Sequence, residues 1–397
     1  MNKIQTILYL GNTEIGDVNK YVKNRHVEEV LMSEQANGSA TAPKMTFSIY
    51  RKSLADVISV RFDDPVDSFL RVGKLRVVFI VNDVVTFFGY LATKPAESGS
   101  GSLQQYALTF YNDFARLSGD VVCATNDETN PYRRFDNRPA HLFVQDLIND
   151  FKRHAQAAGE SLNWSYGTVN QLANKSITYK DFQTVSKALC DAMNNTTGAR
   201  KFDVVFRLDP KDYSHVIIDV LAPRGKRKNI IIQYPSDGVY KLFSNTREVE
   251  EDTEYASHVL SYGTGDLGNK ATNELTAPIA TAHSNSFVKD NFYYRVAVSS
   301  NLEENDNNQA YANKTLAQMS FNAKTPKISL QGRPIKWFDN GNDNDGLGVG
   351  DSFYFTDESN NNSDASGWFR IIGLSVDYDD NGVESVTPTL IKDETDE

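Results

Sequence analysis

The chain has 397 residues, of which 40% are hydrophobic and 23% are charged. At about 100–200 residues per domain, this length predicts two to four folded domains, and the composition excludes disordered, collagen-like and low-complexity proteins. Lys and Arg number 41 against 52 Asp and Glu, which gives a formal net charge of −11. This sign disfavours a protein that grips nucleic-acid phosphates, but it does not exclude the passage of nucleic acid along the protein.

Hydropathy and cysteine usage predict neither a membrane span nor a disulfide framework. The longest uncharged apolar runs, such as Val77–Val81, have about five residues, whereas a membrane span needs about 18–20. The first residues lack the features of a signal peptide, which indicates a protein made in a cytoplasm. Cys123 and Cys190 are far apart and have no CxxC spacing, so we expect two buried thiols.

Residues 1–118 are expected to form an antiparallel sheet or barrel. Apolar and polar residues alternate there with a period of two, and Asn82-Asp83 fits the two-residue turn of a tight hairpin. The expected strands are Met45–Tyr50, Val57–Phe62, Leu75–Val81, Val84–Thr93 and Leu103–Tyr111.

Residues 119–222 are expected to form a small α/β domain, because the apolar spacing changes to that of helices. Pro139 precedes the first helix, and Asp181 is a plausible cap of the second. The apolar faces are expected at Phe143, Leu147, Ile148 and Phe151, and then at Phe182, Val185, Leu189 and Met193. Two strands follow, Phe202–Leu208 and His215–Leu221.

The rest of the chain is expected to form a second barrel that an insertion interrupts. Residues 223–262 give its first part, with strands at 230–234 and 239–244 and an acidic run, Glu248–Glu254, that we interpret as a solvated strand edge. Residues 263–325 are the insertion, with one helix around Leu316. Residues 326–397 give the second part, with strands at 327–331, 351–356, 367–378 and 384–391 and an Asn-Gly hairpin turn at 381–382.

Two distant segments have similar patterns. Phe87–Lys94 followed by Gln105–Phe110 resembles Phe369–Val376 followed by Glu384–Leu390. Each pair places a glycine inside a long strand, then a polar turn and an alternating return strand, and such glycines often mark a bend or a barrel corner. The pattern favours two copies of one barrel, although any two hairpins share part of it.

Common catalytic signatures are missing from the sequence. It has no G-x-S-x-G, H-E-x-x-H, Walker or Rossmann motif, which weakens an enzymatic function. The six histidines are single: His26, His141, His154, His215, His258 and His283. Acidic pairs such as Asp63-Asp64 do not by themselves define a glycosidase site. No catalytic, cofactor-binding or metal residue is therefore assigned.

Two charged runs have alternative interpretations. Asp339–Gly346 is rich in oxygen ligands but breaks the EF-hand pattern, so we expect an exposed turn, with another type of calcium loop as the alternative. Arg224–Lys228 is the strongest basic cluster, and we expect a solvated turn there. A phosphate site or a dock for an acidic partner remains open for this cluster.

The order of parts resembles the baseplate hub of siphophages, that is, the amino-terminal module of tail-associated lysins, and the related myophage hub proteins. The matching segments are Arg138-Pro139-Ala140 with Leu142–Phe151, Ile177–Val185, Phe202–Phe206, Val216–Val220, the helix near Leu316, Pro326–Leu330 and Gly348–Tyr354. The resemblance implies a mixed α+β, mostly β fold with two tail-tube-like antiparallel β-barrels, an intervening α/β domain and an insertion.

The resemblance also implies a function. It predicts a structural homotrimer in the virion tail tip, assembled in the host cytoplasm, which closes the tail tube and opens to let DNA pass. Its implied partners are the distal tail protein ring, the tape measure protein and receptor-binding or fibre proteins, with no cofactor and no sequence-specific nucleic acid. The acidic charge would let DNA slide along the channel. The alternatives are a distal tail protein, which forms a hexameric ring, and a cell-wall hydrolase with its site in 119–325.

Overall fold

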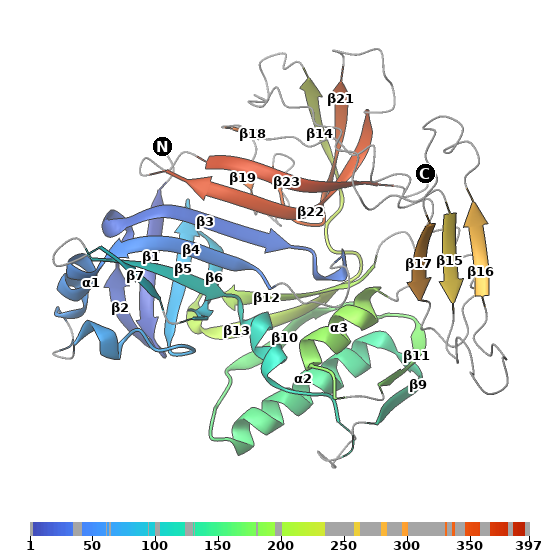
Figure 1. Cartoon of the computed structure of the whole chain (residues 1–397), viewed down its shortest axis with the longest axis horizontal. Helices are drawn as coiled ribbons and strands as arrows, with labels where there is room; N and C mark the ends of the chain where they lie inside the picture. The colour runs from blue at the N-terminus through green and yellow to red at the C-terminus, as the bar shows by residue number, and fades with distance from the viewer. Residues whose placement is uncertain are drawn as a thin grey trace.

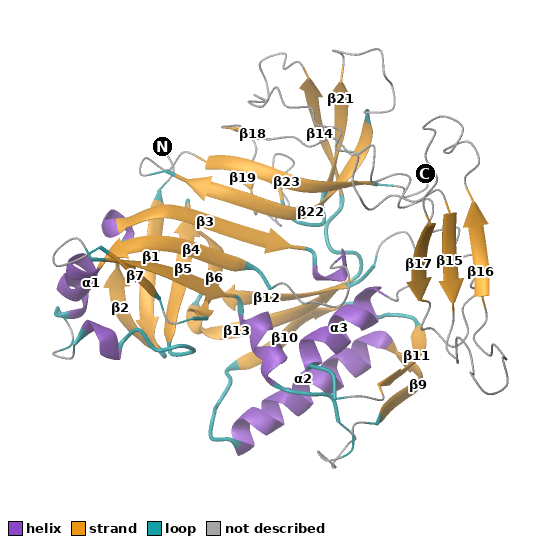
Figure 2. Ribbon diagram, viewed as in Figure 1, coloured by secondary structure: helices purple, strands orange, loops and turns teal. Residues whose placement is uncertain are grey.

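The computed structural model gives the arrangement of the chain (Figures 1 and 2). It describes residues 3–34, 42–60, 62, 65–93, 95–99, 104–123, 130, 132–179, 182–194, 201–234, 258–262, 279–283, 296–300, 330–331, 336–337, 346–357, 366–379 and 384–393. Several expected features lie outside these residues: Asp63-Asp64, Asp181, the strand at 239–244, the acidic run Glu248–Glu254, the helix near Leu316, most of the calcium-like run and the turn at 381–382.

One large sheet contains strands from both ends of the chain. Its main path runs β14-β21-β22-β3-β4-β8-β6-β5-β1-β2, with β7, β18 and β23 attached beside it. The strands are β1 Ile4–Leu10, β2 Thr13–Asp17, β3 Val22–Val30, β4 Lys44–Tyr50, β5 Leu75–Val81, β6 Val84–Leu91, β7 Ala96–Ser98, β8 Gln105–Tyr111, β14 Arg227–Tyr234, β18 Leu330–Gln331, β21 Ser352–Asp357, β22 Gly367–Tyr378 and β23 Glu384–Lys392. The alternation predicted for residues 45–50 is confirmed, since Met45, Phe47 and Ile49 are buried.

The first and last β-regions share a ladder. Residues Gly373–Tyr378 of β22 pair antiparallel with Arg25–Val30 of β3, and a common core packs beneath both regions. Pairing is antiparallel along this sheet except between β14 and β21, which run parallel. The mixed α+β, mostly β class is thereby confirmed.

Two helices and two small sheets form the middle of the chain. Helices α2 Ala140–Ala157 and α3 Val185–Asn194 pack with a sheet of order β10-β13-β12 and with the antiparallel pair β11-β9. The strands are β9 Arg133–Pro139, β10 Trp164–Val169, β11 Asn174–Tyr179, β12 Asp203–Asp209 and β13 Asp212–Leu221. The predicted apolar face of the first helix is confirmed, because Phe143, Leu147, Ile148 and Phe151 are all buried.

The remaining elements are short. A sheet of order β16-β15-β17, from Ile279–His283, His258–Tyr262 and Val296–Ser300, lies at the opposite end of the longest axis from the helix α1, Arg51–Ile58 (Figure 1). Strands β19 Lys336–Trp337 and β20 Gly346–Leu347 pair with each other. Three-residue 3-10 helices occur at Asn19–Tyr21, Met32–Glu34 and Val66–Ser68, and a seven-residue one at Asp113–Gly119. Among the described helices none is long and apolar enough to cross a membrane.

Two predicted elements are wrong in detail. The strand expected at Val57–Phe62 is replaced by helix α1, Arg51–Ile58, because Leu54 and Ile58 lie four residues apart and both enter the core. The second helix begins at Val185, so Phe182 precedes it and is 49% exposed instead of contributing to the apolar face.

Candidate functional site

The basic segment Arg224–Lys228 lies where the three parts of the fold meet. It joins β13 of the α/β part to β14 of the large sheet. The Arg224 side chain is buried, and its Nη1 donates a hydrogen bond to Asp203 Oδ2 at 2.9 Å. Its Nη2 forms an ion pair with Glu29 of β3. The expectation of a solvated turn is therefore wrong for Arg224 and Lys228, which are buried, whereas Lys226 is exposed. We call the segment and its acidic partners the junction.

Asp203 is the most deeply buried acid of the junction, with no exposed surface. Besides Arg224, it accepts a hydrogen bond from the Ser33 N–H at 3.2 Å. Burial raises the pKa of Asp203, and the Arg224 guanidinium opposes that rise by favouring the charged carboxylate. Arg224 thus connects β12, through Asp203, with the first β-region, through Glu29.

The second half of the segment connects to the loop before β21. Asp351 accepts hydrogen bonds from the backbone N–H of Lys226 at 2.9 Å and of Gly348 at 3.0 Å. The buried Lys228 Nζ lies 3.8 Å from Asp351 Oδ2. Burial raises the pKa of Asp351, and these hydrogen bonds and the lysine oppose the rise. Asp351, in the Gly348–Tyr354 segment singled out in the sequence, therefore binds the basic segment through the Lys226 backbone and the Lys228 side chain.

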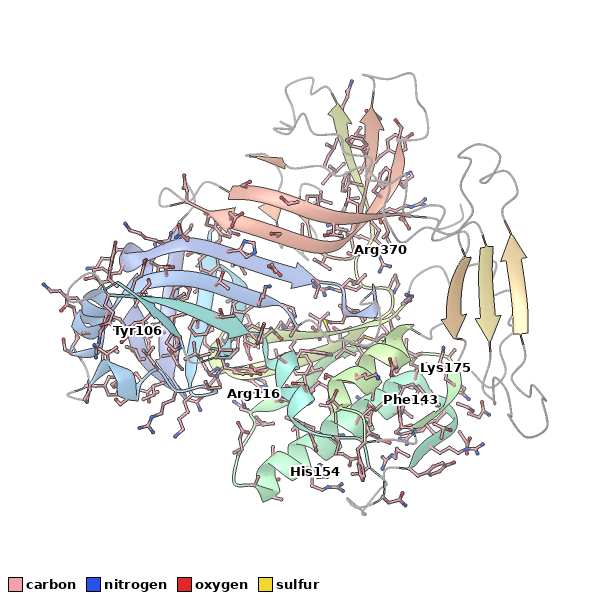
Figure 3. The ribbon with its side chains drawn as sticks, viewed as in Figure 1. Tyr106, Arg116, Phe143, His154, Lys175 and Arg370 are labelled. Carbon is pink, nitrogen blue, oxygen red and sulfur yellow. The ribbon has the colours of Figure 1, made fainter. Side chains whose placement is uncertain are left out.

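Arg370 of β22 completes the junction (Figure 3). Its Nε donates to the Gly350 carbonyl at 3.2 Å, and its Nη2 donates to the Arg224 carbonyl at 3.3 Å. Arg227 Nε lies 3.0 Å from Oδ2 of Asp393, which is buried. Three arginines thus hold the ends of β13, β14, β22 and β23 together.

Two glycines let the two loops of the junction approach each other. Gly225 has φ +77° and Gly350 has φ +96°, both in the region that favours glycine. A Cβ added to Gly225 would lie 2.1 Å from the backbone carbon of Gly350. The backbones at Gly225 and Gly350 therefore lie in direct contact, which leaves no room for a side chain at either position.

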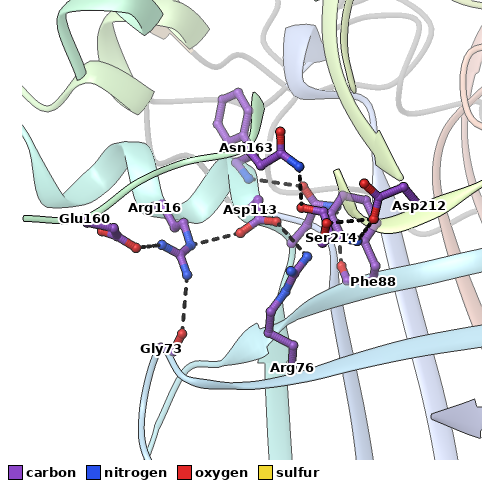
Figure 4. Close-up of polar contacts among 11 residues, drawn as sticks. Gly73, Arg76, Phe88, Asp113, Arg116, Glu160, Asn163, Asp212 and Ser214 are labelled. Carbon is purple, nitrogen blue, oxygen red and sulfur yellow. Dashed lines mark hydrogen bonds and ion pairs between the residues drawn. The ribbon is translucent and has the colours of Figure 1, made fainter. Parts of the chain in front are cut away.

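A second charged cluster joins the first β-region to the α/β part (Figure 4). Asp113, which is buried, lies 2.9 Å from Arg116 Nε and 3.7 Å from Arg76 Nη2. Arg116 also forms an ion pair with Glu160, donates to the Gly73 carbonyl at 3.3 Å and stacks on the Tyr90 ring. Arg116 therefore fixes the loop before β5 against the loop that follows α2.

His26 lies on the ladder between the two β-regions. Its Nδ1 is 2.7 Å from Asp377 of β22, and its Nε2 is 2.9 Å from Glu28, which also pairs with Lys44 at 3.0 Å. Burial lowers the pKa of His26, but the hydrogen bonds with Glu28 and Asp377 outweigh it, so the net shift is upward. The imidazolium form is thus favoured where β3 meets β22.

One arrangement resembles a hydrolase triad. Ser165 Oγ lies 2.8 Å from His215 Nε2, and His215 Nδ1 lies 3.3 Å from Asp209 Oδ2. This is the order of contacts that activates a serine nucleophile. Ser165, however, is the second residue of strand β10 and pairs with Ile217 of β13, whereas a hydrolase nucleophile of this type stands on a sharp strand-to-helix turn. Sequence reasoning missed this trio because its members are separated by up to 50 positions and match no motif.

The other histidines of the α/β part and the two cysteines belong to no catalytic arrangement among the described residues. His154 pairs with Asp120 at 2.7 Å, and His141 Nδ1 accepts from the Leu172 N–H at 3.1 Å. Cys123 and Cys190 are buried free thiols, as expected. Within the described ranges, no group of three His, Cys, Asp or Glu side chains is placed to hold a metal ion.

No protein-family model and no curated protein sequence matches the chain. Solved structures do match its fold. The tail protein from Neisseria meningitidis MC58 is 11% identical with a TM-score of 0.57, and the match covers 98% of this chain and 97% of that chain. The 43 kDa tail protein of prophage MuSo2 from Shewanella oneidensis is also 11% identical with a TM-score of 0.57, and the coverage is 98% and 99%. The resemblance to phage tail proteins is therefore confirmed at the level of the fold.

Proposed function

We propose that the chain is a structural protein of a phage tail tip, a baseplate hub. The observation that carries the proposal is a fold shared with two tail proteins over 98% of the chain. The buried charges at the places where the parts of the fold meet support a mechanical role, since they hold those parts in one arrangement. The division into 1–118, 119–222, 223–262, 263–325 and 326–397 belongs to this proposal.

We infer further that the hub is a homotrimer. A ring of three chains, each with two similar β-regions side by side, presents six units to a hexameric tube, which resolves the mismatch between three-fold and six-fold symmetry. The pairing of β22 with β3 supports this inference, because it places the two β-regions of one chain next to each other. The trimer would close the tube, bind the distal tail protein ring and open when DNA passes.

The test is the mass of the purified chain in solution, by light scattering, with class averages of the same peak by electron microscopy. We expect three times the chain mass of 44.4 kDa and a ring with a pseudo-six-fold outline. A six-subunit ring would favour the distal tail protein. A monomer at every concentration would overturn the hub.

A cell-wall hydrolase is the second candidate, and only the Ser165–His215–Asp209 contacts favour it. A hydrolase would clear cell-wall substrate or cleave activated esters, and Ser165→Ala would abolish that activity. Under the hub proposal the wild-type chain and the Ser165→Ala variant are equally inactive. Turnover that disappears in the variant would replace the hub with the enzyme.

A further inference from the structure

A cavity of about 460 Å³ opens beside the turn that joins β1 to β2, at the end of the molecule that carries α1 (Figure 1). Its lining comes from the end of β1 with its turn and from the segment between α1 and β5: Leu10, Gly11, Ser68, Phe69, Arg71 and Lys74. We name it the Arg71–Lys74 pocket. Small-molecule sites in proteins have volumes of about 300–1,000 Å³, so the pocket has room for a small ligand.

Arg71 differs from every other arginine that the structure describes. The guanidinium group of each of the others contacts an acid, a backbone carbonyl or an amide oxygen. The side chain of Arg71 is exposed and has no hydrogen-bond, ion-pair or ring partner among the described residues, and the same holds for Lys74. Acids outnumber bases by 52 to 41 in this chain, yet two cations at one cavity remain available to an anion.

The backbone that carries the two cations is held in place by hydrogen bonds. The Gly11 N–H donates to the Lys74 carbonyl at 2.9 Å, and the Gly73 N–H donates to the Leu91 carbonyl at 2.9 Å. Arg116 Nη2 also donates to the Gly73 carbonyl at 3.3 Å. A site whose backbone is fixed in advance loses less conformational entropy when a ligand binds.

The side chains of the pocket determine which anion fits. A guanidinium presents paired N–H donors that match two oxygens of one anionic group, and a lysine adds a second positive charge. Ser68 Oγ donates to the Pro65 carbonyl at 2.7 Å, so the charged donors are those of Arg71 and Lys74. Two cations balance a phosphomonoester, whose charge is about −1.5 to −2 at pH 7, better than a single carboxylate.

We propose that the Arg71–Lys74 pocket binds a phosphate group, either as free phosphate or as a small phosphomonoester. Arg71 contacts two phosphate oxygens, and Lys74 neutralises the second charge. The half-buried side chain of Leu10 offers apolar surface to the organic part of an ester. A long polyanion fits less well, because the net charge of −11 repels its remaining phosphates. Every residue of the site comes from one chain, so the inference does not depend on the hub.

The experiment measures binding to the full chain by isothermal titration calorimetry at constant ionic strength, with chloride as the balancing anion. The probes are inorganic phosphate, glycerol 3-phosphate and a single-stranded thymidine oligonucleotide. Arg71→Ala with Lys74→Ala removes both cations, and Arg71→Gln with Lys74→Gln does so with less loss of side-chain volume. Arg134→Ala with Lys187→Ala is the matched control, because it removes one exposed arginine and one exposed lysine elsewhere. Circular dichroism checks that each variant folds.

We expect one saturable site per chain for both small phosphates. Each variant of Arg71 and Lys74 should weaken binding by about tenfold or more, because charge-assisted hydrogen bonds are lost, and the control should bind as the wild type does. Tighter binding of glycerol 3-phosphate than of inorganic phosphate would identify a phosphomonoester as the ligand, and equal affinities would identify free phosphate.

Three results would overturn the inference. The first is that neither small phosphate shows saturable binding to the wild-type chain, and the second is that both variants bind as tightly as the wild type. The third is that the oligonucleotide binds more tightly than the small phosphates and displaces them, which would assign the pocket to a nucleic-acid backbone. None of these results bears on the hub, whose test is the mass of the assembly, so the failure of one proposal is distinguishable from the failure of the other.

Discussion

Replacing Arg224 with Met should be among the most destabilising single changes in the chain. The substitution keeps roughly the length of the side chain but removes its charge. Among the described residues, the fully buried Asp203 then keeps the Ser33 N–H as its hydrogen-bond donor, with Arg370 as a more distant positive charge. Removing one member of a buried ion pair costs about 3–5 kcal/mol, because the other charge stays buried without compensation. For a chain of 397 residues that unfolds as one unit, the unfolding entropy of about 0.8 kcal/mol/K converts this loss into a decrease of roughly 4–6 °C in the melting temperature.

The stability lost in Arg224→Met should depend on pH, because the unpaired carboxyl of Asp203 is buried. Burial raises the pKa of Asp203, and Arg224 opposes the rise, so removing Arg224 lifts the pKa further. A carboxyl whose folded pKa exceeds its unfolded pKa stabilises the fold at low pH and loses that stability as pH rises through the folded pKa. The difference in melting temperature between wild type and Arg224→Met should therefore be larger at pH 8 than at pH 5.

Thermal and urea unfolding, followed by tryptophan fluorescence, measure this effect. Trp164 lies in the α/β part and Trp368 lies in β22. We expect the junction to couple the unfolding of these two parts, so the variant should unfold in two separate transitions. The control is Arg134→Met, which breaks an exposed pair with Asp136 and should cost less than about 1 kcal/mol. A loss from Arg224→Met as small as that of the control would refute the account of the junction as a buried network.

Three further predictions concern other parts of the fold. Gly225→Ala should lower the free energy of unfolding in urea by about 3 kcal/mol or more, because the new Cβ would collide with backbone atoms. Gly159→Ala is the control: its φ is +89° but its Cβ would meet open space, so it should cost about 1–2 kcal/mol. Equal losses in the two variants would contradict this reasoning. His26→Gln should destabilise most below the ordinary pKa of 6.5 and progressively less as pH rises through the raised pKa, and a melting-temperature difference that does not change with pH would count against it. Both cysteines should be unreactive in a thiol titration until denaturant is added, because both are buried and burial raises the pKa of Cys190 to about 12. Reaction of either thiol in the native protein would contradict this prediction.

Local sequence patterns predicted most helices and strands. They did not predict the environment of side chains whose contacts come from distant parts of the chain. The alternation of residues 45–50 and the helical spacing of Phe143 and Phe151 depend on neighbours in the chain, so both were readable. The role of Arg224 depends on Glu29, 195 positions away, and on Asp203, 21 positions away. No local rule separates a buried basic cluster from a solvated one, because the difference lies in which acids the fold brings to it.

Gly89 and Gly373, the two glycines of the internal similarity, have comparable positions in the large sheet. Strand β22 pairs with β21 through Arg370 and with β3 from Gly373 onward, and a bulge against β23 precedes Gly373. Strand β6 gains its pairing with β8 immediately after Gly89, where a Cβ would lie 2.3 Å from the Tyr111 carbonyl oxygen. Both glycines therefore stand where a strand begins a new pairing: β6 keeps β5 and adds β8 after Gly89, and β22 begins its pairing with β3 at Gly373. The new pairing involves a close backbone approach in β6 and a local bend in β22. Their common position is a geometric requirement of the sheet, so it supports two similar β-regions without requiring that one arose by duplication of the other.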